Sequence, residues 1–533
     1  MIEKKSTIYK EFLKVVKEFP FNVALRYEGK AITYKKLNDL VETFGHYYAS
    51  LNLKEGDTIT LIAPNTPEAV ASFLATSMKG LNIHLILPLA SEETIIKEVQ
   101  EKDSKLLIAF SLFLNQYPNI IKMHIPLLVL SPTDSLNIIK KVAFASMNKK
   151  DLKTYNEHKE LPRKKNMKGK DNKIVDYPST KGRVFLSSGG TSGEPKTIML
   201  SDEAILSLIY QGEDIIGLPK EVLPTKSMLA ALPMFHGFGL VMGVLTPLYY
   251  GASAALLPKF HTGPVIKLIK KGQITILTGV PVMYEALLRN PKFKGEMLKN
   301  LDVLFVGGDF ISPSLLDRFN SKLSTYQSKA LLLEGYGLTE TVTVLSVNTI
   351  KEHRSGTIGK PLKNVEVKIV DEDHNLVSPH TIGEIIVSGE TLMNGYYDGT
   401  DCFMELDGKK YVLTGDLGYL DEDGYLYFIS RKKRVIKKKG MNIFPLAIEK
   451  RISQLDFIKE CAYLAKDEPN KVETYLFVAI QNKSQDEALK LLEETFKKSF
   501  FNYEAPDHII FKDTLPKTNV SKIDYTSLAN SLK

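Results

Sequence analysis

Eleven residues in the first half of the chain combine glycines, hydroxyl side chains and one lysine directly after a short apolar run: Leu186-Ser-Ser-Gly-Gly-Thr-Ser-Gly-Glu-Pro-Lys196. Glycine lets a backbone turn tightly and approach a ligand closely. Successive backbone N–H groups, hydroxyls and a lysine together can surround a phosphate. The spacing is not that of the P-loop, because no Ser or Thr follows a Gly-Lys pair. A plain flexible turn has the same composition, so the rest of the chain must decide.

Four further segments follow in order: Tyr336-Gly-Leu-Thr-Glu340, Thr414-Gly-Asp416, Ser430-Arg-Lys-Lys-Arg-Val-Ile-Lys-Lys-Lys-Gly440 and Leu515-Pro-Lys-Thr-Asn-Val-Ser-Lys-Ile-Asp524. With the glycine-rich segment, they resemble the motifs of the adenylate-forming superfamily, which includes acyl-CoA synthetases, luciferases and peptide-synthetase adenylation domains. The resemblance extends from about Ala24 to Asp524. One such motif is weak evidence, whereas five in the same order are specific.

Strand and helix patterns alternate along the chain and predict an α/β fold with parallel sheets. Thr58–Ala63 reads as a strand, Pro67–Met78 as a helix that starts at Thr66, and Leu81–Leu87 as the next strand. The middle repeats this alternation, with strands expected at Ser227–Leu232, Ala252–Leu257, Ile274–Thr278, Val303–Val306 and Ala330–Leu333. A lysine-rich polar segment, 146–182, is expected to be a loop or connector.

The pattern changes to short strands and turns over 355–430, which predicts a small β-rich subdomain. After Arg431, a small α+β domain is expected, with a helix that opens at Pro445. The resemblance implies a large AMP-binding and acyl-binding domain at 1–430, a hinge at 431–434 with Lys433 at its pivot, and a small mobile C-terminal domain at 435–533. Ser430 replaces the glycine that is usual before the hinge.

Composition is that of an ordinary folded protein: of 533 residues, 44% are hydrophobic and 25% are charged, and the net charge is +8. The positive bias favours anionic ligands such as nucleotides and CoA. No nucleic-acid module or zinc spacing is apparent. Two cysteines exclude a disulfide framework and fit a reducing compartment, and no signal peptide is apparent, so we expect a cytoplasmic protein.

One uncharged stretch, Gly237–Leu257, is long enough to span a bilayer. Its internal glycines and proline favour a buried helix, turn and strand instead. Contact with a membrane is therefore expected to be peripheral at most.

The resemblance implies a nucleotide site, whose residues can also be explained structurally: Tyr336 as a core aromatic, Glu340 as a helix-start acid, Asp416 as a turn residue. In the family, the aromatic stacks on adenine, Asp416 accepts the ribose hydroxyls with help from Arg431, and Thr339 contacts the α-phosphate. The implied phosphate-loop residues are Ser188, Gly189, Gly190, Thr191, Ser192, Gly193 and Lys196. Gly308, Glu334, Gly335 and Gly337 complete the implied nucleotide site, and Glu340 with Thr191 is implied to hold Mg²⁺.

The resemblance also implies the residues of the two half-reactions. Lys522 would contact the attacking carboxylate and the α-phosphate, although Ser521 stands where glycine is usual. Lys439 and Gly440 would serve thioester formation with CoA after the small domain rotates. His236 would border the acyl pocket and gate the approach of the carboxylate.

These implications predict an acid–thiol ligase that uses ATP, Mg²⁺ and coenzyme A. Segments around Ile274–Tyr284 and Leu332–Asn348 resemble bacterial medium- and long-chain fatty acid–CoA ligases, and Val280, Val282, Met283 and Gly237–Val244 are candidates for an apolar tunnel. Two alternatives stay open: a ligase that loads an acyl or aminoacyl group onto a phosphopantetheinyl carrier protein, and a non-enzymatic lipid- or nucleotide-binding protein.

Overall fold

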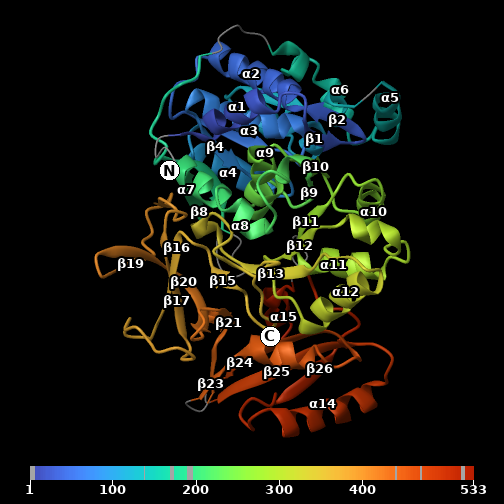
Figure 1. The fold of residues 1–533 in the computed structure, drawn as a ribbon, viewed down its shortest axis with the longest axis vertical. Helices are drawn as coiled ribbons and strands as arrows, with labels where there is room; N and C mark the ends of the chain where they lie inside the picture. The colour runs from blue at the N-terminus through green and yellow to red at the C-terminus, as the bar shows by residue number, and fades with distance from the viewer. Residues whose placement is uncertain are drawn as a thin grey trace.

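A computed structural model describes residues 6–136, 138–167, 173–188, 196–438, 441–468, 471–517 and 523–532. Two large sheets with their helices make up the N-terminal part, a five-stranded sheet lies at the lower left in Figure 1, and a small α+β unit at the bottom closes the chain. The predicted α/β class, with a β-rich subdomain and a smaller C-terminal α+β domain, is confirmed.

The first large sheet contains β7 (Gly182–Ser187) and β8 (Thr197–Ser201), the two strands that flank the glycine-rich segment in the sequence. Its order is β18 (Gly395–Tyr396), β8, β7, β4 (Asn82–Leu85), β3 (Thr58–Ile62), β5 (Ser104–Phe110) and β6 (Leu127–Leu130). Strands β7 to β6 pair in parallel, whereas β8 and β18 run antiparallel to their neighbours.

The second large sheet has nine strands and carries the Tyr336 motif. Its order is β15 (Lys360–Pro361), β14 (Ser346–Val347), β13 (Leu332–Tyr336), β12 (Val303–Val306), β11 (Ile276–Gly279), β9 (Ser227–Ala230), β10 (Ser253–Leu256), β1 (Val23–Tyr27) and β2 (Lys30–Thr33). Strands β13 through β1 are parallel, as the alternation of strands and helices predicted.

Helices fill the space between these sheets and cover the outer face of the second. The largest apolar core joins both sheets to α1 (Ile8–Glu18), α2 (Tyr34–Ser50), α3 (Pro67–Lys79) and α7 (Asp202–Ile209), and a second core lies under α10 (Thr262–Lys270), α11 (Pro281–Arg289) and α12 (Pro313–Thr325). The Thr66 side chain caps α3 by accepting from the Ala69 N–H, as expected. The remaining helices before residue 431 are α4 (Glu92–Glu101), α5 (Ile138–Met147), α6 (Lys153–Glu157), α8 (Gly212–Ile216) and α9 (Thr246–Tyr249).

The uncharged stretch near residue 240 is buried in the protein. It forms a π-helix over Phe238–Leu245, then α9 and β10, all within the core. The expected helix, turn and strand are confirmed, although a π-helix was not foreseen. No helix among the described residues is both long and apolar enough to cross a membrane.

The polar segment 146–182 is more structured than predicted. It contains α6 and a 3-10 turn over Lys164–Asn166. The Arg163 guanidinium stacks on Tyr155 and donates to the carbonyls of Tyr155 and His158, which ties the end of α6 back onto itself. Local side chain–backbone bonds therefore help to order a segment that is poor in aliphatic residues.

A five-stranded antiparallel sheet follows, made of β16 (Val365–Val370), β17 (Gly383–Gly389), β20 (Lys409–Leu420), β19 (Phe403–Leu406) and β21 (Leu426–Arg431). The C-terminal unit contains the hairpin β22 (Ile436–Lys438) and β23 (Met441–Ile443), the sheet β24 (Ile458–Glu468), β25 (Lys471–Ile480) and β26 (His508–Phe511), and helices α13 (Pro445–Ile452), α14 (Gln485–Ser499) and α15 (Tyr525–Asn530). It has an apolar core of its own around Ile448 and Leu476. The boundaries at 430 and 434 stay predictions.

Candidate active site

The two described ends of the glycine-rich loop are bonded to each other. The Ser188 N–H donates to the Lys196 carbonyl at 2.7 Å, and the Lys196 N–H donates to Ser188 Oγ at 3.0 Å. The hairpin of β7 and β8 beneath them is fixed to α7 by a buried ion pair, Arg183 Nε to Asp202 Oδ1 at 2.5 Å. Gly189, Gly190, Thr191, Ser192 and Gly193 lie outside the described residues, so their predicted contacts stay predictions.

A tyrosine that the sequence did not single out stands between two predicted site residues. The Lys196 ammonium lies 4.7 Å from the centroid of the Tyr396 ring. The Tyr396 hydroxyl donates to Glu340 Oε1 at 2.8 Å. Strand β18 pairs with β8, and this pairing brings Tyr396 next to the loop. A strand of two residues has no periodicity, so no sequence pattern marks this tyrosine.

Asp416 and Arg431 face each other across β20 and β21, where they are paired in register. Arg431 Nε lies 2.9 Å from Asp416 Oδ1, and the Tyr336 hydroxyl donates to Asp416 Oδ2. Despite the close ion pair, Oδ1 has no hydrogen bond of good geometry among the described residues. The Asp416 side chain is 0% exposed, and this burial raises its pKa to about 6, against the opposing effects of Arg431 and the Tyr336 hydrogen bond.

Glycines allow the backbone at the end of β13 to pass close to its neighbours. A Cβ on Gly337 would lie 1.4 Å from the Thr343 carbonyl oxygen, so no other residue fits without a backbone shift. At Gly335 a side chain would also be crowded, since a Cβ there would lie 3.2 Å from the Val347 side chain. Gly308 follows β12 with a φ of +75°. The glycines of this motif thus have a steric reason, which the sequence alone did not give.

Glu334 in β13 faces the C-terminal unit. Removal from water raises the pKa of Glu334 to about 7, and the Lys450 ammonium of α13 opposes the shift. Lys450 also lies over the Phe310 ring at 5.1 Å. The wall beside Tyr336 therefore touches the small domain in this arrangement.

His236 and Thr339 border the same space from two loops that pack backbone to backbone. A Cβ on Gly237 would lie 2.1 Å from the Val342 carbonyl oxygen, directly after the turn Thr339–Thr341. The half-buried His236 ring lies 4.6 Å from that of Phe235. The close approach of Gly237 to Val342 brings the loop of the predicted gate residue, His236, next to the loop of the predicted phosphate contact, Thr339.

One large cleft, about 3220 Å³, connects these features. Most predicted residues within the described part line it: His236, Ser188, Lys196, Gly308, Glu334, Gly335, Tyr336, Gly337, Thr339, Glu340, Arg431 and Lys433. Asp416 does not line the cleft, because it is buried behind Tyr336 and Arg431. Lys439, Gly440 and Lys522 lie outside the described residues, and their roles stay predictions.

The cleft also has many apolar side chains in its lining: Leu87, Pro88, Leu89, Phe110, Leu112, Phe113, Phe235, Phe260, Val280, Val282 and Met283. Of the segment Gly237–Val244, only Gly237, Phe238 and Gly239 line it, whereas Leu240 to Val244 are buried in the core. The tunnel prediction was therefore wrong for those five residues, because the π-helix points them into the core that joins the two large sheets.

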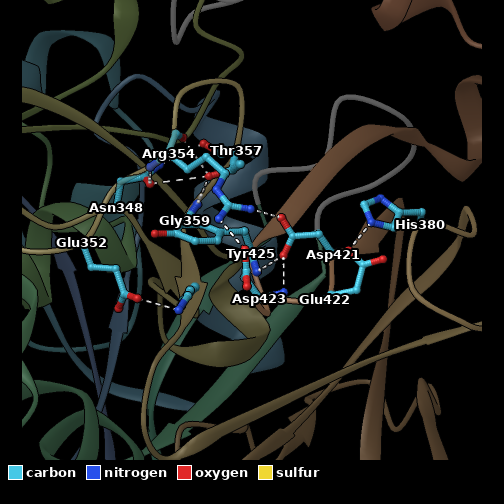
Figure 2. Close-up of polar contacts among 11 residues, drawn as sticks. Asn348, Glu352, Arg354, Thr357, Gly359, His380, Asp421, Glu422, Asp423 and Tyr425 are labelled. Atoms are coloured by element: carbon cyan, nitrogen blue, oxygen red, sulfur yellow. Dashed lines mark hydrogen bonds and ion pairs between the residues drawn. The ribbon is translucent and has the colours of Figure 1, made fainter.

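The loop between β14 and β15 joins the two sheets that carry Tyr336 and Asp416 (Figure 2). The Arg354 guanidinium contacts the carboxylates of Asp421 and Asp423 and lies 4.1 Å from the Tyr425 ring centroid. On the other side, the Arg354 N–H donates to Asn348 Oδ1 at 2.9 Å. The Asn348 N–H in turn donates to the Glu334 carbonyl at 2.9 Å. A continuous set of bonds thus runs from the turn after β20 to β13.

A sequence profile of the AMP-binding enzyme family matches residues 12–397. The chain belongs to the AMP-binding enzyme family. A long-chain-fatty-acid–CoA ligase of Bacillus subtilis is 27% identical over 521 residues, covering 95% of this chain and 91% of the relative. One from Salmonella typhimurium is 29% identical, covering 93% and 89%. These matches confirm the predicted resemblance, and they support the predicted enzyme class, an AMP-forming acid–CoA ligase.

Solved structures of this family share the fold. An anthranilate CoA ligase in complex with anthranoyl-AMP superposes with a TM-score of 0.83 at 20% identity, covering 100% of this chain and 98% of that one. An o-succinylbenzoate coenzyme A synthetase of Bacillus subtilis in complex with ATP and a magnesium ion superposes with a TM-score of 0.77 at 20% identity, covering 98% of this chain and 99% of that one. At such identities the likeness shows the fold alone.

Proposed function

We propose that this AMP-binding enzyme activates a medium- or long-chain fatty acid with ATP and transfers the acyl group to coenzyme A. One observation carries the proposal: a single cleft is lined both by the predicted nucleotide-site residues Lys196, Tyr336 and Glu340 and by many apolar side chains. A nucleotide with its charged phosphates suits the polar residues, and an alkyl chain suits the apolar ones. The fatty acid–CoA ligase relatives support the same acid.

The first half-reaction joins acid and nucleotide. A carboxylate oxygen attacks the α-phosphorus of ATP in line, the bond from this phosphorus to the bridging oxygen breaks, and pyrophosphate leaves. The chain contributes mainly positioning and electrostatic stabilisation. Lys196 and the glycine-rich loop hold the outer phosphates in our proposal, Thr339 contacts the α-phosphate, and Lys522 contacts both reacting groups. His236 borders the path of the carboxylate.

Glu340 suits the magnesium ion that ATP brings. Its Oε1 accepts the Tyr396 hydrogen bond, and Oε2 makes none among the described residues, so it is available as a ligand. Mg²⁺ binds through one or two carboxylates together with phosphate oxygens, and it neutralises the charge that develops on the phosphates. No three His, Cys, Asp or Glu side chains in the described part of the chain gather into a metal site of their own.

The ribose requires a change around Asp416. Its carboxylate is covered by Tyr336 and Arg431, and no described residue makes a hydrogen bond of good geometry to Oδ1. An ionised carboxylate accepts only, so the two ribose hydroxyls are suitable donors once the Tyr336 hydroxyl moves away. The Tyr336 ring would then stack on one face of the adenine, and Gly308 would lie near the other face of the adenine.

The second half-reaction forms the thioester. The sulfur of CoA attacks the acyl carbon, the bond from this carbon to the phosphate oxygen breaks, and AMP leaves. We propose that 435–533 rotates on 431–434 relative to 1–430, which withdraws Lys522 and brings Lys439 and Gly440 to the cleft. Lys433 lies at the pivot, between Lys432, which pairs with Glu384, and Arg434, which pairs with Glu449.

Pyrophosphate release and thioester formation test the proposal. Purified protein with ATP and Mg²⁺ is offered acids of 2 to 18 carbons, with CoA, with a phosphopantetheinylated carrier protein, or with neither. We expect turnover with acids of medium or long chain that needs CoA. Turnover only with the carrier protein, or only with short or amino acids, would contradict the proposed acceptor or acid, and no activity with any acid would contradict the enzyme itself.

A further inference from the structure

We propose that Tyr396 is a positioning residue that keeps Lys196 and Glu340 apart, so that both charges stay available for the nucleotide and its metal ion. The inference rests on the proposed function, since it assigns Lys196 to phosphate and Glu340 to Mg²⁺. It concerns a residue that lies in no motif of the sequence analysis.

The tyrosine contacts the two charged groups with different parts of its side chain. Its hydroxyl donates to Glu340 Oε1 at 2.8 Å, and its ring lies 4.7 Å from the Lys196 ammonium. A hydroxyl bonded to a carboxylate makes a charge-assisted hydrogen bond, and an ammonium over a ring face is held by the ring quadrupole. One side chain thus satisfies a cation and an anion separately.

The backbone around Tyr396 is fixed on both sides. Tyr396 pairs with Ile198 in β8, and the Tyr397 N–H donates to the Thr197 carbonyl at 2.8 Å. The Asn394 N–H donates to the Met199 carbonyl at 2.9 Å, and the Lys102 ammonium lies 4.2 Å from the Tyr397 ring centroid. The tyrosine therefore has little freedom to leave its place between the two charges.

Without this side chain, the two charges have a reason to pair. Lys196 and Glu340 both line the cleft and are half-buried, and opposite charges attract more strongly there than in bulk water. A direct Lys196–Glu340 pair would have to break before phosphate and metal could bind. Tyr396 prevents this competition by occupying the space between them.

Three variants separate the hydroxyl from the ring. Tyr396→Phe removes only the hydrogen bond to Glu340, so we expect about a tenfold higher Mg²⁺ concentration for half-maximal pyrophosphate release, with the KM for the fatty acid unchanged. Tyr396→Leu also removes the ring, so we expect weaker ATP binding in titration calorimetry even without Mg²⁺. In Tyr396→Leu with Glu340→Gln, Lys196 can no longer pair with Glu340, and Mg²⁺-free ATP binding should recover to the wild-type value.

Tyr397→Phe is the matched control. Its hydroxyl donates to the Glu101 carbonyl, away from the two charges, and we expect Mg²⁺ dependence and ATP affinity to stay at wild-type values. Melting temperatures of all variants check that the fold is kept.

The double variant decides whether Tyr396 acts by separating the charges. If Mg²⁺-free ATP binding is as weak in the double variant as in Tyr396→Leu, Tyr396 does not act in this way. If the wild-type protein binds no ATP, the proposed function is wrong together with this inference. If the wild-type protein binds ATP and the Tyr396 variants show the same ATP affinity and Mg²⁺ dependence, this inference alone is wrong.

Discussion

The Tyr336 hydroxyl donates its hydrogen bond to Asp416 Oδ2, which joins the end of β13 in one sheet to the middle of β20 in another. The Tyr336 ring also lies 5.7 Å from that of Phe428 in β21. In our assignment, these two residues serve the adenine and the ribose of one nucleotide. The Asp416 carboxylate, which should accept from the ribose hydroxyls, thus already accepts a hydrogen bond from Tyr336, whose ring should stack on the adenine.

This relationship predicts opposite effects for two substitutions. Asp416→Asn removes the charged acceptor, so we expect ATP affinity to fall about 10- to 100-fold, as for other hydrogen bonds to charged groups. Tyr336→Phe keeps the stacking ring and removes only the competing donor, so ATP affinity should be kept or rise. Titration calorimetry measures both. Weaker binding by Tyr336→Phe, comparable to that of Asp416→Asn, would show that the hydroxyl supports the nucleotide rather than competes with it.

Asp416 also predicts how nucleoside affinity depends on pH. Burial raises its pKa to about 6, and the ribose hydroxyls favour the ionised carboxylate, so affinity for adenosine should rise as the pH rises to 6 and level off above it. Below pH 6, we expect a loss of up to about tenfold per pH unit. In the unliganded protein, folding stability changes with pH in the opposite direction to adenosine affinity. The folded state holds this proton more tightly than an ordinary carboxyl group with a pKa near 4 does, so the stability contributed by Asp416 falls as the pH rises from 4 to 6.

Adenosine is the suitable probe because it has no phosphate that titrates in this range. Glu334, with a pKa near 7, faces the same wall, and Glu340 and Glu384 add negative charge around Asp416. Asp416→Asn separates these groups: its affinity should be low and lack the step near pH 6. A step of unchanged size in that variant would assign it to another group.

The close backbone approach at Gly337 predicts a severe effect for a single methyl group. In Gly337→Ala, the Cβ would lie 1.4 Å from the Thr343 carbonyl oxygen, so the backbone must shift. We expect the free energy of unfolding to fall by about 3 kcal/mol or more, with loss of ATP binding. In Gly263→Ala, the new methyl group meets nothing within 4 Å, and stability should be unchanged or rise by up to about 1 kcal/mol. Urea unfolding compares the two, and equal losses would contradict the steric argument.

Sequence patterns predicted the elements that have strong local signals. Thr66 caps α3, Pro445 opens α13, and the turn at Asp421–Gly424 joins β20 to β21, as expected. The motif strand before Tyr336 was placed at Ala330–Leu333, yet β13 extends from Leu332 to Tyr336. Gly335 within it is unfavourable in a strand by propensity, and pairing with β14 overrides this preference.

The site was predicted by motif and completed only by tertiary contacts. Lys196, Tyr336, Glu340 and Arg431 were identified from the sequence, and all four line the cleft. Tyr396 was missed because its importance lies in its contacts with Lys196 and Glu340, which come from distant parts of the chain. The burial of Asp416 was also not foreseen, because it depends on the packing of two separate sheets.

The loop in Figure 2 predicts that a residue far from any phosphate affects nucleotide binding. Asn348 is 4% exposed, accepts from the Arg354 N–H, and donates to the Thr357 carbonyl at 2.9 Å. In Asn348→Ala, both backbone groups lose their partner, so the free energy of unfolding should fall by about 1 to 3 kcal/mol. The same loop bonds to β21, since the Leu426 N–H donates to the Gly359 carbonyl. We therefore expect ATP affinity to fall as well, because Tyr336 and Asp416 lose their fixed relation.

Asn375→Ala provides the comparison for Asn348→Ala. Asn375 is exposed in the turn after β16, where its side chain makes a weak 3.4 Å contact with Asp371 and no other hydrogen bond to a described residue. Its substitution should leave ATP affinity unchanged and stability nearly so. ATP affinity is measured at a temperature where Asn348→Ala is still folded, so that a loss of binding reports on the site rather than on unfolding. Under those conditions, wild-type affinity in Asn348→Ala would mean that the Tyr336–Asp416 contact alone sets the geometry of the nucleotide site.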